Sequence, residues 1–175
     1  DSSKLKDGDW VLGIGGPFQL SQSVTAGIVS ATGRNNVGFA EYEDFIQTDA
    51  PINPGNSGGA LVNIHGELIG INTAIASPTG GSVGVGFAIP SNMARTAMQS
   101  LIKTGRVVRG FLGASTQDVT PLLGKIFKLP DVKGAIVTDL QAKGSAEKAG
   151  LRRGDVIERF DGRDVMDSGH LRNLM

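Results

Sequence analysis

The sequence predicts a mainly β chain, in which a β-barrel or β-sandwich unit is followed by one helix and then by a smaller unit of mixed α and β structure. Three observations support this prediction. Glycine accounts for 26 of 175 residues and recurs between short β-branched runs, a pattern typical of short strands joined by tight turns. One segment near the middle of the chain has helical periodicity. Beyond it, helical and strand-like segments alternate.

Short apolar and β-branched runs are expected to form the strands of the first unit. They span residues 11–14, 24–31, 45–48, 60–64, 67–75 and 83–89. His65 and Gly66 separate two of these runs and predict a hairpin turn, whereas residues 35–44 are polar and predict a loop. Strands at this spacing indicate a barrel or a sandwich.

A helix is expected to lead out of the first unit, with Ser91 as its N-cap and Gly105 as its stop. Its predicted apolar face consists of Ala94, Ala97, Met98, Leu101 and Ile102. Residues 106–109 predict a linker, so we expect two domains, at 1–105 and 106–175. The elements expected in the second domain are helices over 121–127 and from Ser168, a helical turn over 145–149, and strands over 134–139 and 156–160.

The composition excludes several classes of site. The chain has 17 basic and 17 acidic residues, and no long basic run indicates nucleic-acid binding. It has no cysteine, which excludes disulfides, thiolate catalysis and cysteine-ligated zinc. No apolar stretch approaches the ~18 residues of a membrane span, and no segment has the pattern of a signal peptide. Asp1 is not a start methionine, so we expect either a mature form or an internal piece of a longer protein, and Met175 falls inside a predicted helix, so the C-terminal end is also expected to be cut.

The most informative stretch is Gly55-Asn56-Ser57-Gly58-Gly59. Serine is a weak nucleophile at neutral pH and needs a general base, together with donors for the oxyanion that it creates. Flanking glycines let backbone N–H groups turn toward a substrate carbonyl. The stretch also fits the nucleophile elbow of α/β-hydrolases, which requires a helix after the serine. Because a β-hairpin is predicted there, a serine on a loop that enters a β-barrel is the better interpretation.

Several longer segments resemble the HtrA (DegP/DegQ) family of serine endoproteases, and most closely its bacterial periplasmic members. They are residues 46–50, 53–61, 66–75, 86–90 and 109–113. The resemblance covers essentially all 175 residues. It implies a chymotrypsin-like (trypsin-like) β-barrel half, then a linker helix, then a partial PDZ domain of α+β type that is truncated at its C-terminus.

The resemblance assigns roles around the serine. It implies that Ser57 is the nucleophile and that the N–H groups of Gly55 and Ser57 form the oxyanion hole, with Asn56 setting the turn between them. The segment expected to bind substrate as an added strand consists of Ile71, Asn72, Thr73, Ala74 and Ile75. With residues 83–87 it would line the specificity pocket. Pro51 stands where digestive trypsins carry a selective aspartate, which favours a small apolar side chain at the cleaved position.

The family's catalytic histidine and aspartate are expected upstream of residue 1. His65 lies eight residues after Ser57, roughly 20 Å or more along an extended strand, so we expect an exposed turn residue. His170 is expected on the helix surface or in the groove of the second domain. Asp49 is interpreted as a cap for backbone donors, and orienting a base is the alternative.

Two segments away from the serine are candidate binding or regulatory sites. Arg34 matches the family's regulatory loop, which relays effector binding to the active site, and a solvated loop arginine is the open alternative. The segment that resembles the carboxylate-binding loop of PDZ domains consists of Arg109, Gly110, Phe111, Leu112 and Gly113. Glycine-flanked N–H groups there would form a nest for a C-terminal carboxylate. A glycine-flanked buried strand is the alternative.

The predicted function is that of a periplasmic serine endopeptidase that degrades misfolded proteins in protein quality control through an acyl-enzyme on Ser57. The resemblance implies neither a metal nor an organic cofactor. The expected partners are unfolded or misfolded polypeptides, C-terminal peptides at the PDZ domain, and further copies of the chain in a trimer-based homo-oligomer. Two alternatives remain, a non-catalytic peptide-binding module or pseudo-protease, and a chaperone-like holdase.

Overall fold

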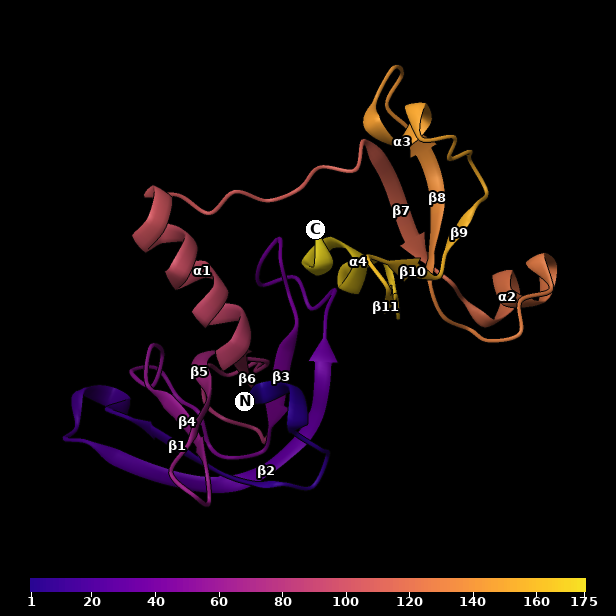
Figure 1. Cartoon of the computed structure of the whole chain (residues 1–175). Coiled ribbons are helices and arrows are strands. Elements are labelled where there is room, and N and C mark those ends of the chain that lie inside the picture. The colour runs from indigo at the N-terminus through magenta and orange to yellow at the C-terminus, as the bar shows by residue number, and fades with distance from the viewer. The chain divides into compact units, whose positions relative to one another are not determined.

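The computed structural model describes residues 1–175 apart from the side chain of Gln19. The chain folds into two compact units, Asp1–Val108 and Arg109–Met175 (Figure 1). Each unit has a hydrophobic core of its own. In the described part of the chain, no helix is both long enough and apolar enough to cross a bilayer.

The first unit is a closed barrel of six antiparallel strands. They are β1 (Trp10–Gly15), β2 (Ser23–Arg34), β3 (Phe45–Thr48), β4 (Ala60–Asn63), β5 (Leu68–Ile75) and β6 (Gly86–Pro90). Their order around the barrel is β1-β2-β3-β6-β5-β4, and β1 pairs with β4 to close it. Short 3₁₀ turns span Ser2–Lys4 and Pro17–Gln19. The mainly β prediction is therefore confirmed, and the architecture is a barrel rather than a sandwich.

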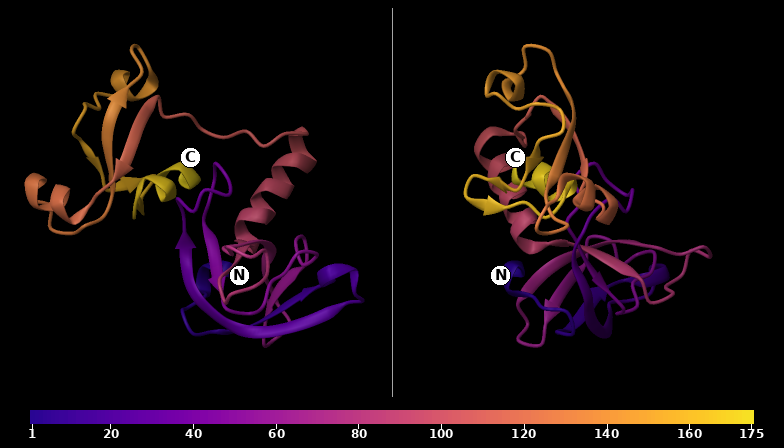
Figure 2. Two further views of the ribbon diagram at one scale, coloured as in Figure 1. Left: turned by 180° about the vertical axis from the view of Figure 1, so that it is seen from behind. Right: turned by 90° about the vertical axis from the view of Figure 1, so that its right-hand side faces the viewer.

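Alternate residues of the strands point into the barrel. The buried apolar side chains of the core are Val11, Val29, Ile46, Ala50, Leu61, Ile69 and Ala88. β2 is 12 residues long, and its pairing with β3 shifts register after Val29 and again after Ala31. Bulges of this kind bend a strand, and Figure 2 shows β2 curving along the barrel. The curved strand carries the chain to the polar segment 35–44.

The longest helix, α1 (Ser91–Thr104), directly follows β6 and contacts β5 and β6. The prediction of Ser91 as N-cap is wrong. Pro90 still has extended backbone and takes the cap position, so Ser91 is the first helical residue. Gly105 ends the helix as predicted. The apolar side chains of α1 that are exposed by half or more are Met98, Leu101 and Ile102.

The second unit contains two small sheets and three short helices. Its elements are β7 (Ala114–Asp118), α2 (Pro121–Phe127), β8 (Ala135–Leu140), α3 (Ser145–Lys148), β9 (Val156–Ile157), β10 (Arg159–Phe160), β11 (Arg163–Asp164) and α4 (Ser168–Leu174). One sheet has the order β7-β8-β9, and β10 pairs with β11. α4 contacts β7 and β8. The hydrophobic core of the second unit combines Ala135, Val165 and Leu171 with partly buried side chains around them.

Two strand predictions in the second unit need correction. The single strand expected over residues 156–160 is two short strands that have different partners, since β9 pairs with β8 whereas β10 pairs with β11. Between them, the carbonyl of Glu158 accepts a hydrogen bond from the N–H of Val165 at 2.8 Å. β7 was not predicted. Its sequence, Ala-Ser-Thr-Gln-Asp, lacks the apolar alternation that marks a half-buried strand, although the exposure of its residues does alternate along the strand.

Candidate active site

Ser57 lies on the loop between β3 and β4, directly after a tight turn. In this first turn, the N–H of Asn56 donates to the carbonyl of Asn53 at 2.9 Å. Pro54 and Gly55 occupy the two central positions, and Gly55 has a φ of 102°. Proline followed by a residue with positive φ is the signature of a type II turn, in which glycine fits the second central position. The local sequence therefore explains the sharp change of direction just before Ser57.

A second tight turn contains Ser57 itself. The N–H of Gly59 donates to the carbonyl of Asn56 at 2.9 Å, so Ser57 and Gly58 take the central positions. Gly58 has a φ of 83° and again supplies the conformation that glycine tolerates best. Two successive turns thus project the Ser57 side chain from the loop, where the residue is exposed.

Two backbone N–H groups of this loop have no hydrogen-bond acceptor among the residues that the structure describes. They are those of Gly55 and Ser57. The neighbouring N–H groups of Asn56, Gly58 and Gly59 all donate to backbone carbonyls. Gly55 and Ser57 are both exposed, so these N–H groups are accessible from solvent, and they belong to the residues on either side of the buried Asn56. They are available to stabilise a developing negative charge near the Ser57 hydroxyl.

Residues 16–18, which follow β1, support the serine loop. The N–H of Gly16 donates to the Gly55 carbonyl at 3.3 Å, and the N–H of Phe18 donates to the Pro54 carbonyl at 2.9 Å. The residue types do not indicate this support, because any residue except proline can donate a hydrogen bond from its backbone N–H. These hydrogen bonds fix the carbonyls of Pro54 and Gly55. Because the C=O and the N–H of a trans peptide unit point in opposite directions, the N–H of Gly55 points away from Phe18.

The Ser57 hydroxyl donates a hydrogen bond to the Thr73 carbonyl at 3.0 Å. Thr73 belongs to β5 and lies at an irregularity in the pairing with β6, between Asn72 and Ala74. β4 covers the other edge of β5 only as far as the Ala60–Ile71 pair. β5 continues to Ile75 without a partner strand on that edge in the described structure. A bare strand edge therefore begins beside the serine.

Asn72 joins the serine loop to the barrel. Its side chain is buried, and its amide Nδ2 donates to the carbonyls of Ile14 and Ala60, both at 3.2 Å. Its backbone accepts from the N–H of Gly58 at 2.8 Å and donates to the Gly59 carbonyl at 2.9 Å. Four hydrogen bonds thus tie this one residue to β1, to the start of β4 and to the loop. The predicted substrate residue Asn72 has a structural role in addition to any contact with substrate.

Residues 82–86, which lead into β6 and include its first residue, pack against the base of the serine loop. A Cβ atom on Gly86 would lie 2.9 Å from Cγ1 of Ile52, which is itself buried. The N–H of Ser82 donates to Oδ1 of Asn53 at 2.8 Å. Residues 82–86 and the loop are therefore in direct contact, and the buried side chain of Ile52 makes this contact partly apolar. The specificity pocket that residues 83–87 would line stays a prediction. Pro51 is exposed.

The titratable residues weighed as partners for Ser57 have other contacts. Asp49 accepts a hydrogen bond from the N–H of Ile28 at 2.7 Å, which agrees with a backbone-capping role. His65 is exposed in the turn that follows β4, at the far end of that strand from Ser57. His170 lies on α4 of the second unit, and its Nδ1 accepts from the N–H of Met166 at 3.2 Å. The Ser57 hydroxyl donates to a carbonyl and not to a histidine.

The polar segment 35–44 is organised around a carboxylate that the sequence analysis missed. Glu43 is buried and accepts hydrogen bonds from the N–H groups of Val37, Phe39 and Ala40 at 2.6, 2.6 and 2.9 Å. Burial raises the pKa of the Glu43 carboxyl group, but the N–H groups of residues 37–40 lower it by more, so the pKa lies below its ordinary value. Glu43 is therefore ionised at neutral pH.

Arg34 stands at the end of β2, where this segment begins. Its Nε donates to Oε1 of Gln47 on β3 at 2.8 Å, and its backbone pairs with Phe45. The side chain is thus held against the adjacent strand. Its regulatory role stays a prediction.

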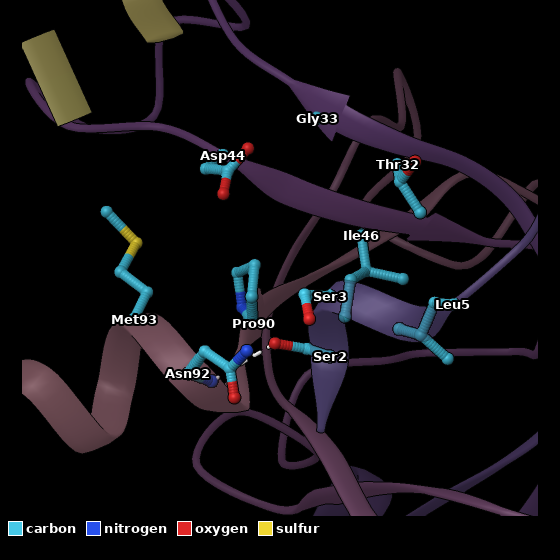
Figure 3. A pocket seen from close by; sticks show the side chains of 10 residues that line it. All are labelled: Ser2, Ser3, Leu5, Thr32, Gly33, Asp44, Ile46, Pro90, Asn92 and Met93. Atoms are coloured by element: carbon cyan, nitrogen blue, oxygen red, sulfur yellow. Dashed lines mark hydrogen bonds between the residues drawn. The ribbon is translucent and has the colours of Figure 1, made fainter. Parts of the chain in front are cut away.

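A cavity of about 280 Å³ lies at the base of the same segment (Figure 3). Thr32 and Asp44 line it from the barrel, and Met93 lines it from α1. The N–H of Asn92 donates to the Ser2 hydroxyl at 3.1 Å beside it. No residue of the serine loop lines this cavity, so it is separate from the candidate active site.

The loop that precedes β7 has the backbone pattern of an anion nest. The N–H groups of Phe111, Leu112 and Gly113 have no acceptor in the described structure, whereas the N–H of Gly110 donates to the Met175 carbonyl at 2.9 Å. Their carbonyls are bonded to residues 141–146. β7 pairs only with β8, so its other edge is open. Successive N–H groups without acceptors suit a carboxylate, and an open edge suits an added strand.

Comparisons with known proteins agree with both units. The trypsin family model matches residues 1–98, and a PDZ domain model matches residues 136–175. A probable periplasmic serine endoprotease, DegP-like, of Chlamydia trachomatis serovar D is 52% identical over 175 residues. The periplasmic pH-dependent serine endoprotease DegQ of Escherichia coli K12 is 50% identical over 173 residues. These matches cover 100% and 99% of this chain, but only 35% and 38% of the relatives.

A solved structure is similar over nearly the whole chain. It is the HtrA-type protease AlgW with a tripeptide, which is 50% identical and superposes with a TM-score of 0.82. The match covers 99% of this chain and 57% of that one. Both the order of the two units and the barrel itself are therefore shared with proteins of this type.

Proposed function

Because this chain belongs to the trypsin family of serine proteases, in its HtrA (DegP/DegQ-like) branch, we propose that it is the serine-bearing part of a periplasmic serine endoprotease that degrades misfolded proteins. The observation that carries the proposal is the pair of unbonded N–H groups, on Gly55 and Ser57, beside the Ser57 hydroxyl. They give the exposed serine the donors that acyl transfer requires. The proposed domains are 1–105, the barrel with its helix, and 106–175, the PDZ portion.

The proposed reaction begins when an unfolded polypeptide pairs with the bare edge of β5 at residues 73–75. Ser57 Oγ attacks the substrate carbonyl and loses its proton to a general base, which then protonates the departing amine. The N–H groups of Gly55 and Ser57 stabilise the oxyanion. Water then hydrolyses the ester on Ser57 and restores the hydroxyl group.

The general base and the acid that orients it are proposed to lie outside these 175 residues. Support comes from the contacts of His65, His170 and Asp49 described above, and from relatives that are much longer than this chain. Because the Thr73 carbonyl holds the Ser57 hydroxyl, the base must displace this hydrogen bond. A substrate N–H that donates to the Thr73 carbonyl would compete with the Ser57 hydroxyl and so help to free it for the base.

The experiment that tests this function compares one polypeptide in two states. The intact protein is incubated with native ribonuclease and with the same ribonuclease after reduction and carboxymethylation. We expect at least ~10-fold faster cleavage of the unfolded form, because proteolysis follows the population of open chain. Suppressed aggregation without cleavage would instead indicate a holdase. Binding without either effect would indicate a pseudo-protease.

The second unit is proposed to bind C-terminal peptides through the N–H groups of residues 111–113, with the peptide added beside β7. Trimer-based assembly of the whole protein is proposed from the resemblance alone. A peptide with a free C-terminal carboxylate should bind the intact protein at least ~10-fold more tightly than its C-terminal amide, because charge-assisted hydrogen bonds are lost. Fluorescence anisotropy of the labelled pair measures this ratio. Equal affinities would contradict the carboxylate site.

A further inference from the structure

The segment between β2 and β3 is folded around one side chain of its own. Both oxygen atoms of the Glu43 carboxylate accept hydrogen bonds from the backbone, Oε2 from Val37 and Oε1 from Phe39 and Ala40. The residue Glu43 is only 5% exposed. Hydrogen bonds to an ionised group are stronger than those between neutral groups. The conformation of residues 37–40 therefore depends on Glu43.

This conformation places the ring of Phe39 on two buried aromatic side chains. The ring centroid of Phe39 lies 5.6 Å from that of Phe87 and 6.4 Å from that of Phe45, and the last two lie 5.8 Å apart. Phe45 and Phe87 are each 4% exposed, whereas Phe39 is 48% exposed. Such aromatic contacts typically stabilise a fold by more than the burial of their apolar area alone would. Phe39 therefore covers this cluster on its solvent side.

Phe87 connects the cluster to the strands around the candidate active site. On β6 it pairs with Gln47 of β3 and with Ala74 of β5. Its neighbour Ala88 points into the barrel core, so Phe87 points to the outer face. Its other neighbour, Gly86, packs against Ile52 at the base of the serine loop. The aromatic cluster thus packs on the outer face of β6, whose first residue contacts the serine loop on the other face.

We propose that Glu43 is a positioning residue for substrate recognition. By holding residues 37–40, it keeps Phe39 in contact with Phe87. This contact fixes residues 83–87, which form one wall of the proposed pocket for the side chain at the cleaved position. This inference rests on the proposed protease function. It concerns the choice of substrate and not the chemistry at Ser57. Without the carboxylate, residues 37–40 no longer hold Phe39 on Phe87. Residues 83–87 can then change conformation and accept other substrate side chains.

Two substitutions in the intact protein separate the parts of this proposal. Glu43→Gln removes the negative charge and replaces one acceptor oxygen by a donor. Phe39→Ala removes the ring and leaves the backbone donors to Glu43, and because Phe39 is about half exposed the fold should survive. Phe39→Tyr restores a ring and should behave as the wild type. Glu67→Gln is the matched control, since Glu67 is an exposed glutamate in the turn between β4 and β5.

The measurement is kcat/KM for two peptides that differ only in the cleaved residue, valine in one and phenylalanine in the other. For both Glu43→Gln and Phe39→Ala we expect the valine preference to fall by about 10-fold, mainly through KM, since pocket contacts discriminate on this scale. The rate at which a small fluorophosphonate labels Ser57 should stay within about twofold of wild type, because the chemistry is unchanged. Glu67→Gln should change neither quantity.

An unchanged valine preference in both variants, or an equal loss of peptide cleavage and of Ser57 labelling, would overturn the inference. A wild-type protein that neither cleaves the peptides nor reacts with the fluorophosphonate would overturn the proposed function itself, and the inference with it. The two failures are therefore distinguishable.

Discussion

Replacing Ser57 by alanine is expected to reduce kcat/KM for casein or a peptide substrate by about 10⁴-fold or more in the intact protein. The reason is that the residual acceleration would come only from the oxyanion donors and from substrate binding, which the substitution leaves in place. The hydroxyl donates one hydrogen bond, to the Thr73 carbonyl, and the residue is exposed, so the fold should be unaffected. The loss should therefore lie in kcat with little change in KM.

Two controls accompany this substitution. Ser21→Ala changes an exposed serine in the loop that precedes β2 and should retain wild-type turnover. Peptide binding to the second unit should be the same in Ser57→Ala and in the wild type. Undiminished casein cleavage by Ser57→Ala would show that another residue is the nucleophile.

Replacing Gly55 by alanine should cost about 10²–10³-fold in kcat, the effect typical of a lost oxyanion donor. A Cβ atom there would lie 2.3 Å from the Gly16 carbonyl oxygen, and Gly55 has a φ of 102°. Because the obstacle is backbone, the loop itself must move, and the N–H groups of Gly55 and Ser57 move with it. KM should change less than kcat, since the edge of β5 stays in place.

Gly58→Ala is the matched control for this prediction. Gly58 also has a positive φ, 83°, but a Cβ atom there would meet nothing within 4 Å. We expect a conformational cost of about 1–2 kcal/mol and a loss in kcat below ~10-fold. Steady-state kinetics with a chromogenic peptide measure both variants. Equal kinetic effects of the two substitutions would contradict the oxyanion assignment.

Local patterns in the sequence predicted most of the barrel. The β-branched runs and the turn at His65 and Gly66 correspond to β4 and β5, because strand alternation and turn residues both act over a few residues. Pro54 and Gly55 likewise indicate the turn before Ser57 from their types alone. Three predictions failed: the helix boundary at Ser91, the single strand over residues 156–160, which is two short strands, and the absence of a strand at β7, whose side chains carry no apolar alternation.

The parts of the site that depend on distant contacts could not be predicted. The support from Gly16 and Phe18 consists of backbone N–H groups donating to backbone carbonyls 36 or more residues away in the chain, and any residue except proline can supply these donors. Glu43 has the residue type of a solvated loop, and its burial depends on how residues 37–40 fold back on it. Which residues pair along β5, and where its edge becomes bare, depends on the register of three strands.

The most direct test of the account is the mass of the peptide that contains Ser57 after the intact protein has reacted with a fluorophosphonate. A serine beside working oxyanion donors and a general base reacts selectively with such a reagent. We expect one phosphonyl adduct per chain, located on Ser57 and absent from Ser57→Ala. A protein that cleaves casein while Ser57 remains unmodified would contradict the central claim that Ser57 is the nucleophile.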